Sequence, residues 1–269
     1  MGTIGNKTAV CGENLDISSP AIDRAVSVLE LLAQSRRGLN ISEVSRKLGL
    51  PKSSTHRILL TLESRNCVQK DQRTGRYAFG LKLVSMTRAA LANMEPREQA
   101  RPLLASLMQK TGLTVHMALL ESGQAVLVDR IERPGTPRAG VWIGKTLDAN
   151  STAVGKALLA FLPKDEFEGE FGSRSFVRRS HQTITSIARL RDDLARVREL
   201  GYSVDNEEDE AGARCVGAPV FGPEGRIAAA ISVAGTTEQI PESRIHELGP
   251  LVRQYAAAIS ANLSIRLAL

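Results

Sequence analysis

The residues best suited to specific polar contacts lie in one short run, Pro51-Lys52-Ser53-Ser54-Thr55-His56-Arg57. Short hydroxyls and basic groups hydrogen-bond to base edges and to phosphate oxygens when a helix enters the major groove of DNA. The same composition also suits the solvated, capped start of an ordinary helix. The neighbouring elements have to decide between these two interpretations.

A second candidate for chemistry is Cys215, which follows Arg214 at the start of an expected strand. With His116 or His181 as a base, such a thiol could be the nucleophile of a hydrolase. The alternative is a small buried cysteine of the core, which is the commoner role. Four histidines in 269 residues supply few bases, and none lies in a known catalytic signature. We therefore expect no enzyme activity.

The remaining motifs predict neither a nucleotide site nor a metal site. Gly155 and Lys156 lack the earlier glycine of a phosphate-binding loop, and Ala157 stands where that loop has Ser or Thr. The acidic run at 207–210 lacks the interleaved glycine and the spacing of a calcium loop. We expect no cofactor and no bound metal.

The elements around the polar run have the order of a helix-turn-helix. Apolar residues at three-to-four spacing predict a helix that Ser19 caps and that ends before Gly38. A short helix that Ser42 caps should end at Gly49, and residues 52–65 should form the next helix. The polar run then lies at the N-terminal turn of the second helix of the motif, which is the turn that enters the major groove.

A hairpin should follow this motif. Residues 67–70 and 77–79 predict two short strands, joined by a polar turn that contains Gly75. Such a hairpin behind a helix-turn-helix is called a wing, and Arg73 and Arg76 lie near its tip. The turn, the basic run and the wing together favour DNA binding over a merely solvated helix face.

The distribution of charge supports two modules with different tasks. The net charge is +6, and residues 1–80 hold 12 Lys and Arg against 7 Asp and Glu, whereas residues 81–269 hold 23 against 22. A length of 269 residues suits two domains. A small basic module attached to a nearly neutral larger one indicates phosphate binding plus a separate function.

Several protein classes can be set aside. The longest apolar stretches, such as 228–233, are far shorter than the roughly 20 residues of a membrane-spanning helix, and the first thirty residues contain no secretory signal. Cys11, Cys67 and Cys215 are odd in number and far apart, which fits no disulfide framework. We expect a cytoplasmic protein with reduced thiols.

The second part of the chain mixes helices and strands, which predicts an α+β architecture with a mostly antiparallel sheet flanked by helices. The expected helices are 81–93, 97–110, 153–161, 187–200 and 241–267, and the expected strands are 114–120, 125–131, 140–143, 202–204, 215–221 and 226–234.

Several of these segments resemble a known family. In the first part they are IDRA at 22–25, LGLPKSSTHRIL at 48–59 and GRY at 75–77. In the second they are GLTVHMA at 112–118, VGKALLAFLP at 154–163, RELGYSVD at 198–205 and GARCVGAPVF at 212–221. Their order and spacing resemble the IclR family of bacterial transcription regulators almost continuously from residue 20 to 267. The resemblance implies a winged helix-turn-helix followed by a mixed α/β, GAF-like domain that binds an effector.

The resemblance also implies a pocket for a small molecule, often a carboxylate, beside the helix around Gly155. Free amides at that helix start would suit a carboxylate. By position in the motifs we expect the pocket to contain Ala153, Val154, Asp205, Cys215 and Ser232.

Two positions depart from the pattern of this family. Asn150 stands where many relatives have His, and Ala234 stands where some have a second strand hydroxyl. We therefore hypothesise that a site lined by Val154 and Ala234 prefers an effector less polar than a two-carbon acid.

The sequence thus predicts a tail at 1–18, a winged helix-turn-helix at 19–80, a linker helix at 81–95 and an effector-binding and oligomerisation domain at 96–269.

The expected partners are double-stranded DNA with a near-palindromic operator, a small-molecule effector and further copies in a homodimer or homotetramer. Two alternatives are a second domain that only oligomerises or docks a protein, and a hydrolase that carries a DNA-binding module. Repressor and activator are equally compatible with the sequence. The expected DNA contacts are Lys52, Ser53, Ser54, Thr55, His56, Arg57, Arg73 and Arg76.

Overall fold

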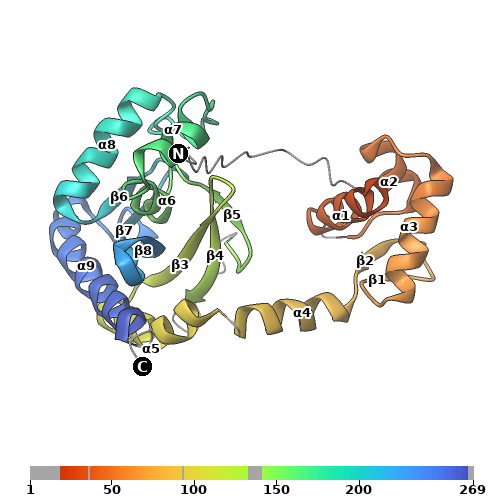
Figure 1. Ribbon diagram of the computed structural model, residues 1–269, viewed down its shortest axis with the longest axis horizontal. Helices are drawn as coiled ribbons and strands as arrows, with labels where there is room; N and C mark the ends of the chain where they lie inside the picture. The colour runs from red at the N-terminus through yellow and green to blue at the C-terminus, as the bar shows by residue number, and fades with distance from the viewer. Residues whose placement is uncertain (1–18, 36, 93, 133–140, 266–269) are drawn as a thin grey trace, which may run out of the picture. The chain divides into compact units, whose positions relative to one another are not determined.

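The chain divides into two compact units, Met1–Ala90 and Leu91–Leu269 (Figure 1). The structure is a computed structural model that describes residues 19–35, 37–92, 94–132 and 141–265. The expected tail at 1–18 lies outside the described residues.

Most of helix α4 (Leu81–Ala92) belongs to the first unit. Three helices and a two-stranded hairpin form the rest of its described part. They are α1 (Pro20–Ala33), α2 (Ile41–Leu48), α3 (Lys52–Ser64), β1 (Val68–Lys70) and β2 (Tyr77–Phe79). The apolar faces of the helices meet in a small core, in which the side chains of Val28, Val44, Leu59 and Tyr77 are completely buried. This order of elements is the expected winged helix-turn-helix.

The start of α2 differs from the prediction. Asn40, not Ser42, caps the helix: its side chain accepts a hydrogen bond of 2.9 Å from the Glu43 amide, and the Glu43 carboxylate accepts one of 2.8 Å from the Asn40 amide. This reciprocal pair is a capping box. Ile41 is therefore already helical, and Gly49 ends α2 with a φ of 65°, a left-handed conformation that glycine adopts without strain.

The second unit is built on one antiparallel sheet of six strands. The spatial order is β5-β4-β3-β8-β7-β6, and every neighbouring pair is antiparallel. Residues 141–143, part of an expected strand at 140–143, form no strand; the short strand of this region lies later, at Thr146–Asp148. The strands are β3 (Thr114–Glu121), β4 (Gln124–Ile131), β5 (Thr146–Asp148), β6 (Ser203–Asn206), β7 (Ala213–Phe221) and β8 (Ile227–Thr236).

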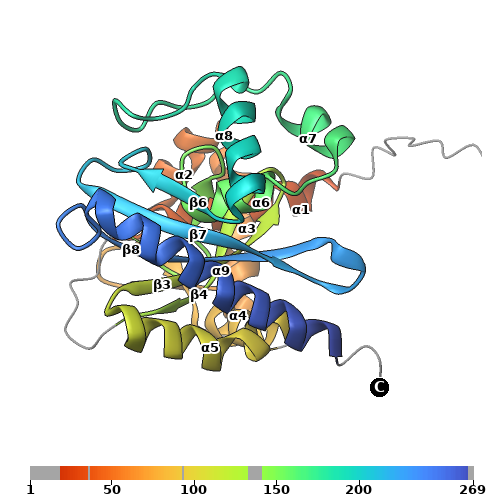
Figure 2. The ribbon, with the colours of Figure 1, turned by 90° about the vertical axis from the view of Figure 1, so that its left-hand side faces the viewer.

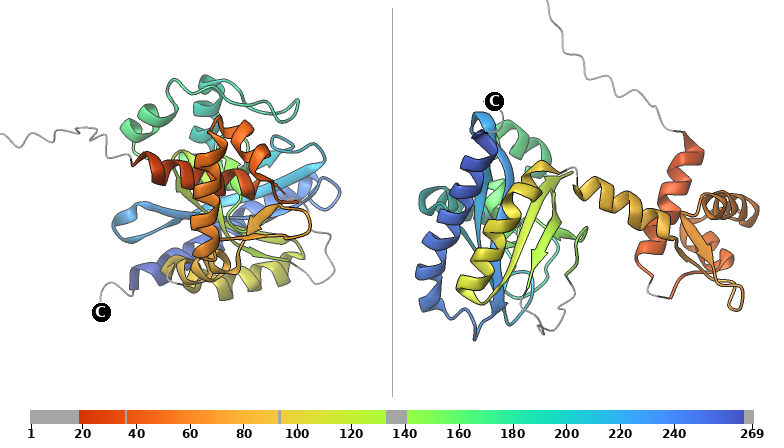
Figure 3. Two further views of the ribbon diagram at one scale, coloured as in Figure 1. Left: turned by 90° about the vertical axis from the view of Figure 1, so that its right-hand side faces the viewer. Right: turned by 90° about the horizontal axis from the view of Figure 1, so that it is seen from below.

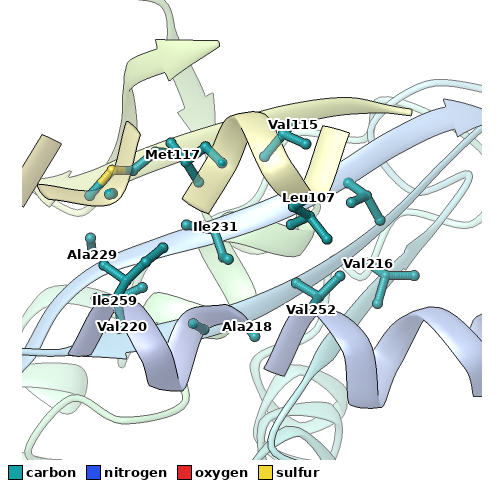
Figure 4. Close-up of a cluster of buried hydrophobic side chains, with 14 of the residues drawn as sticks. Leu107, Val115, Met117, Val216, Ala218, Val220, Ala229, Ile231, Val252 and Ile259 are labelled. Atoms are coloured by element: carbon teal, nitrogen blue, oxygen red, sulfur yellow. The ribbon is translucent and has the colours of Figure 1, made fainter. Parts of the chain in front are cut away.

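Two long helices cover one face of this sheet. They are α5 (Glu95–Thr111), which follows α4 (Leu81–Ala92), and α9 (Glu242–Ile265), and both lie in front of the sheet in Figure 2. Between these helices and the sheet lies the largest apolar core, in which Leu107, Met117, Ile231 and Ile259 are completely buried (Figure 4). Aliphatic side chains fill the space between this face and the two helices.

The opposite face carries α6 (Ala153–Leu159), against which α8 (Ile187–Leu200) packs, and α7 (Lys164–Phe171) shares an apolar cluster with α8. In the left view of Figure 3, α7 and α8 lie above the sheet. The prediction contained no α7. Its start has the signals of a helix, with Pro163 before it and Asp165 and Glu166 in its first turn, and it buries Phe167 and Phe171. In the described part of the chain, no helix combines the length and the apolar character that a membrane crossing requires.

Candidate functional site

The first turn of α3 presents a basic, polar surface. Lys52, Ser53, His56 and Arg57 are exposed, and Pro51 precedes the helix with an extended ψ of 139°. The N-terminal end of a helix carries a partial positive charge, which adds to that of the two cationic side chains. This surface can bind phosphate and reach base edges.

Two hydroxyls of the same run are not equally available. Thr55 is completely buried, and its hydroxyl donates a hydrogen bond of 3.1 Å to the Pro51 carbonyl. The side chain faces the core of the first unit, so Thr55 is corrected from an expected DNA contact to a structural residue. Ser54 is half-buried at the margin of the surface.

The two arginines of the wing have different surroundings. Arg73 is exposed, and its amide donates to the Asp71 carboxylate over 2.8 Å. Hydrogen bonds from the Thr74 side chain and from the Arg73 and Thr74 amides lower the pKa of Asp71. The turn is thereby ordered while the Arg73 side chain stays free of it, so Arg73 is the basic group that the wing offers to solvent.

Arg76 instead joins the wing to α2. Its guanidinium donates over 2.7 Å to the Gly38 carbonyl and over 3.1 Å to the Glu43 carboxylate, which is the one that takes part in the capping box. About a third of the side chain is exposed. Arg76 therefore positions the wing, and only the remaining part of its surface can approach DNA.

In the second unit, the strand register gathers the expected ligand residues on one face of the sheet. Asp205 lies opposite Cys215, and Cys215 lies opposite Ala234. Ser232, two residues before Ala234 on the same strand, lies in the adjacent row. Residues opposite one another, and residues two apart along a strand, share a face. Asp205, Cys215 and Ser232 thus share the face that carries α6.

Asp205 is a buried acid with a strongly shifted pKa. Its carboxylate accepts hydrogen bonds of 2.8 Å from the Glu208 amide and of 3.4 Å from the Asp209 amide. Burial outweighs these bonds and raises the pKa of Asp205 to about 7, and the Glu208 carboxylate adds to the rise. Near neutral pH this side chain can either donate or accept a hydrogen bond.

Cys215 does not have the surroundings of a nucleophile. Burial, followed by the negative charge of Asp205, raises the pKa of its thiol well above the ordinary value. His116 lies on β3, separated from β7 by β8, which places the two strands about 10 Å apart. Burial also lowers the pKa of His116 to about 4. The described residues therefore contain no Cys215–His116 catalytic pair.

The start of α6 is fixed beside these residues. Thr152 caps it by accepting a hydrogen bond of 3.2 Å from the Gly155 amide, and the Ser203 hydroxyl donates over 2.6 Å to the Ala153 carbonyl. A Cβ atom at Gly155 would lie 2.4 Å from the Cα atom of Ala149, so only glycine fits. Ala153 and Val154 are buried, and amides in a first helical turn have no acceptor within the helix.

Lys156 is a feature that the sequence prediction missed. Its side chain is only 1% exposed, and its ammonium group lies 2.6 Å from the Glu208 carboxylate and 2.9 Å from that of Asp193. The two acids outweigh burial and raise the pKa of Lys156. The ion cluster connects α6 to α8 and to the loop before β7. The position of Lys156 among the apolar residues of a helix indicates that its side chain is buried. The local sequence does not indicate which acids pair with it.

A polar cavity of about 180 Å³ opens next to this loop. Two of its lining residues are paired, because the Arg179 guanidinium donates a hydrogen bond of 2.7 Å to the Asp148 carboxylate. Burial raises the pKa of Asp209, another lining residue. None of the five expected ligand residues lines this cavity. Asn150, the departure from the expected His, is buried nearby and donates over 2.9 Å to the Ile184 carbonyl. The cavity is lined by Lys145, Thr146, Leu147, Asp148, Arg179, Asp209 and Glu210.

Comparisons with known proteins cover both units. Residues 21–72 match the family described as the IclR helix-turn-helix domain, and residues 88–261 match the bacterial transcriptional regulator IclR C-terminal family. The HTH-type transcriptional regulator XynR of Escherichia coli is 30% identical over 90% of this chain and 96% of its own length.

Solved structures show the same architecture. The IclR structure from Thermotoga maritima has a TM-score of 0.73 and 29% identity, over 91% of this chain and 98% of its own. An IclR homologue from Microbacterium hydrocarbonoxydans, solved with 4-hydroxybenzoate, has a TM-score of 0.76 and 24% identity, over 90% of this chain and 98% of its own. The likeness extends over both units of the fold.

Proposed function

Because the chain belongs to the IclR family of bacterial transcriptional regulators, we propose that it controls a metabolic operon in response to a small organic carboxylic acid. It is a DNA-binding regulator with an effector-binding domain, and not an enzyme. We propose four further properties: the class of effector, the residues that contact DNA, the oligomeric state, and a location in the cytoplasm, where the operator DNA lies.

DNA contact is assigned to the exposed side chains of the first turn of α3 and to the wing. The exposed first turn of α3, with Lys52 and Arg57 on one basic surface, is the observation that carries this assignment. The refined contact set is Lys52, Ser53, Ser54, His56, Arg57 and Arg73, with a smaller part for Arg76.

The proposed assembly is at least a homodimer, and a homotetramer is compatible with it. No residue in the described helix α4 is buried within the chain, and its large apolar side chains Leu81, Val84 and Met86 are 81%, 64% and 56% exposed. Apolar side chains in this number on one helix favour contact with another protein surface. A second copy would present two DNA-binding units to a near-palindromic operator.

The effector is assigned to the sheet face that contains Asp205, Cys215 and Ser232, next to the buried start of α6 at Ala153 and Val154. Polar side chains on the sheet beside an apolar helix start suit an acid with an apolar body. The 4-hydroxybenzoate in the Microbacterium homologue is a ligand of this kind. Ala234 supplies no hydroxyl, which supports an effector less polar than a two-carbon acid.

DNA binding is tested by fluorescence anisotropy with the intergenic DNA beside the gene, at fixed salt. Arg57→Ala should weaken specific binding by about 1–3 kcal/mol if the side chain contacts a base. Arg189→Ala, at an exposed position on α8, is the matched control and should bind normally. Unchanged affinity of the Arg57 variant would show that α3 is not the recognition helix.

The effector is tested by thermal shift with a panel of acids from glyoxylate to 4-hydroxybenzoate, followed by calorimetric titration. An acid with an apolar body should stabilise the protein and change its affinity for DNA. Tight binding confined to the smallest acids would contradict the size preference. A panel without any shift would favour the alternative, a second domain that only oligomerises or docks a protein.

A further inference from the structure

We propose that His116 contacts the effector, and that His116, Ser232 and Arg130 form one recognition row for its anionic group. This inference rests on the proposed effector function. It adds a residue for which neither the motifs nor the comparisons give a role.

The strand register places these three side chains next to one another. His116 on β3 lies opposite Ser232 on β8 and opposite Arg130 on β4. Opposite residues of antiparallel strands share a face and have Cβ atoms about 4.5–5.5 Å apart. Val115 and Met117, the neighbours of His116, are buried in the core under α5 and α9. His116 therefore points to the other face, on which the expected ligand residues lie.

Polar atoms of this row have no partner within the described residues. The Nε2 atom of His116 and the Nε atom of Arg130 are buried and make no hydrogen bond there. Ser232, which lies opposite His116 on β8, is 2% exposed. Buried polar groups are nearly always hydrogen-bonded, so neighbouring groups without protein partners indicate a binding site.

The row lies next to the part of the sheet face that α6 covers closely. His116, Cys215 and Ala234 are partly exposed. In the row that follows His116 on β3, Ala118 and Ala230 are completely buried and pack in one cluster with Val154 of α6. On β3 the completely buried part of the face therefore ends before His116. A ligand bound there would contact His116 and Ser232 together with the row that contains Cys215.

The charges around His116 favour an anion. Burial, together with the positive charges of Arg130 and Lys145, lowers the pKa of His116 to about 4. The imidazole is thus neutral at neutral pH and can donate one N–H bond. Arg130 is held by Glu132 over 2.6 Å and by the Val141 carbonyl over 2.6 Å, which fixes its guanidinium beside the row.

The test measures the binding of 4-hydroxybenzoate, benzoate and glyoxylate, with 4-hydroxybenzamide and benzamide as neutral analogues, by calorimetry on the full-length protein. His116→Phe keeps a ring but removes the hydrogen bond, and should raise the Kd of the bound acid about tenfold to a hundredfold. His116→Gln keeps a donor and should raise it less than His116→Phe does. His246→Gln, at an exposed position on α9, is the matched control.

The comparison between acid and amide separates recognition from a structural role. The wild type should prefer the acid, and His116→Phe and Arg130→Met should reduce that preference, whereas His246→Gln should keep it. An acid that binds the wild type and His116→Phe equally would overturn the role of His116 and leave the proposed function standing. Equal binding of acid and amide to the wild type would overturn the anion row. Absence of binding by all three acids would overturn this inference together with the proposed acid effector.

Discussion

Replacement of Asp205 by Asn should flatten the pH dependence of stability. Asp205 is 2% exposed, and its carboxylate accepts hydrogen bonds from the amides of Glu208 and Asp209. The carbonyl oxygen of an Asn can accept the same bonds. The substitution therefore removes the ionisation and keeps the geometry.

The size of the effect follows from the pKa of about 7, against an ordinary value of 3.8. The native state holds the proton more tightly than the unfolded state, so stability falls as the pH rises from about 4 to about 7. Each unit of difference corresponds to about 1.36 kcal/mol. Between pH 5 and pH 8 the wild type should lose about 2–3 kcal/mol more unfolding free energy than Asp205→Asn.

The measurement is urea unfolding followed by circular dichroism at pH 5, 6, 7 and 8, at one protein concentration. Asp192→Asn, at an exposed position of α8, is the control and should follow the wild type. Parallel pH profiles of the wild type and Asp205→Asn would refute the conclusion that burial holds the Asp205 proton.

Substitutions at Lys156 and Arg76 test two sets of contacts in the structure. Lys156→Met should destabilise the protein by about 3–5 kcal/mol, because it leaves two carboxylates without their buried cation. The lost stability is measured by urea unfolding. The double variant Lys156→Met/Glu208→Gln should recover part of it. Equal stability of Lys156→Met and the wild type would exclude the ion cluster. Arg76→Ala should lower the stability of the first unit by about 1 kcal/mol, whereas Arg73→Ala should change only DNA affinity. Thermal unfolding and fluorescence anisotropy are measured for both arginine variants. A loss of stability in Arg73→Ala but not in Arg76→Ala would contradict the anchoring role of Arg76.

The sequence predicted the elements that have strong periodicity and clear ends. Helices such as α1, α3 and α8 follow from apolar spacing, and Gly49 ends α2 as expected. The cap of α2 was assigned to Ser42 because a hydroxyl before an apolar residue is a good capping signal. Asn40 is an equally good signal two residues earlier, and its partner Glu43 at the third helical position decides in its favour.

The parts that local patterns could not determine depend on contacts between distant segments. Helix α7 is short, and its burial rests on packing against α8, while β5 is three residues long and exists through its pairing with β4. The burial of Thr55 depends on how α3 packs, and the partners of Lys156 lie 37 and 52 positions away. Register places His116 beside Ser232, and register is set by pairing that no single segment contains.

Asp129 gives the ligand face a fixed connection to the opposite side of the sheet. It is completely buried on β4, and it binds Arg97 over 3.4 Å and Arg101 over 3.0 Å, both on α5. The next residue along the strand is Arg130, whose side chain points to the other face. If the proposed effector displaces β4, we expect α5 to move with it, because separation would leave the buried Asp129 carboxylate without its two cations. Helix α5 directly follows α4 along the chain.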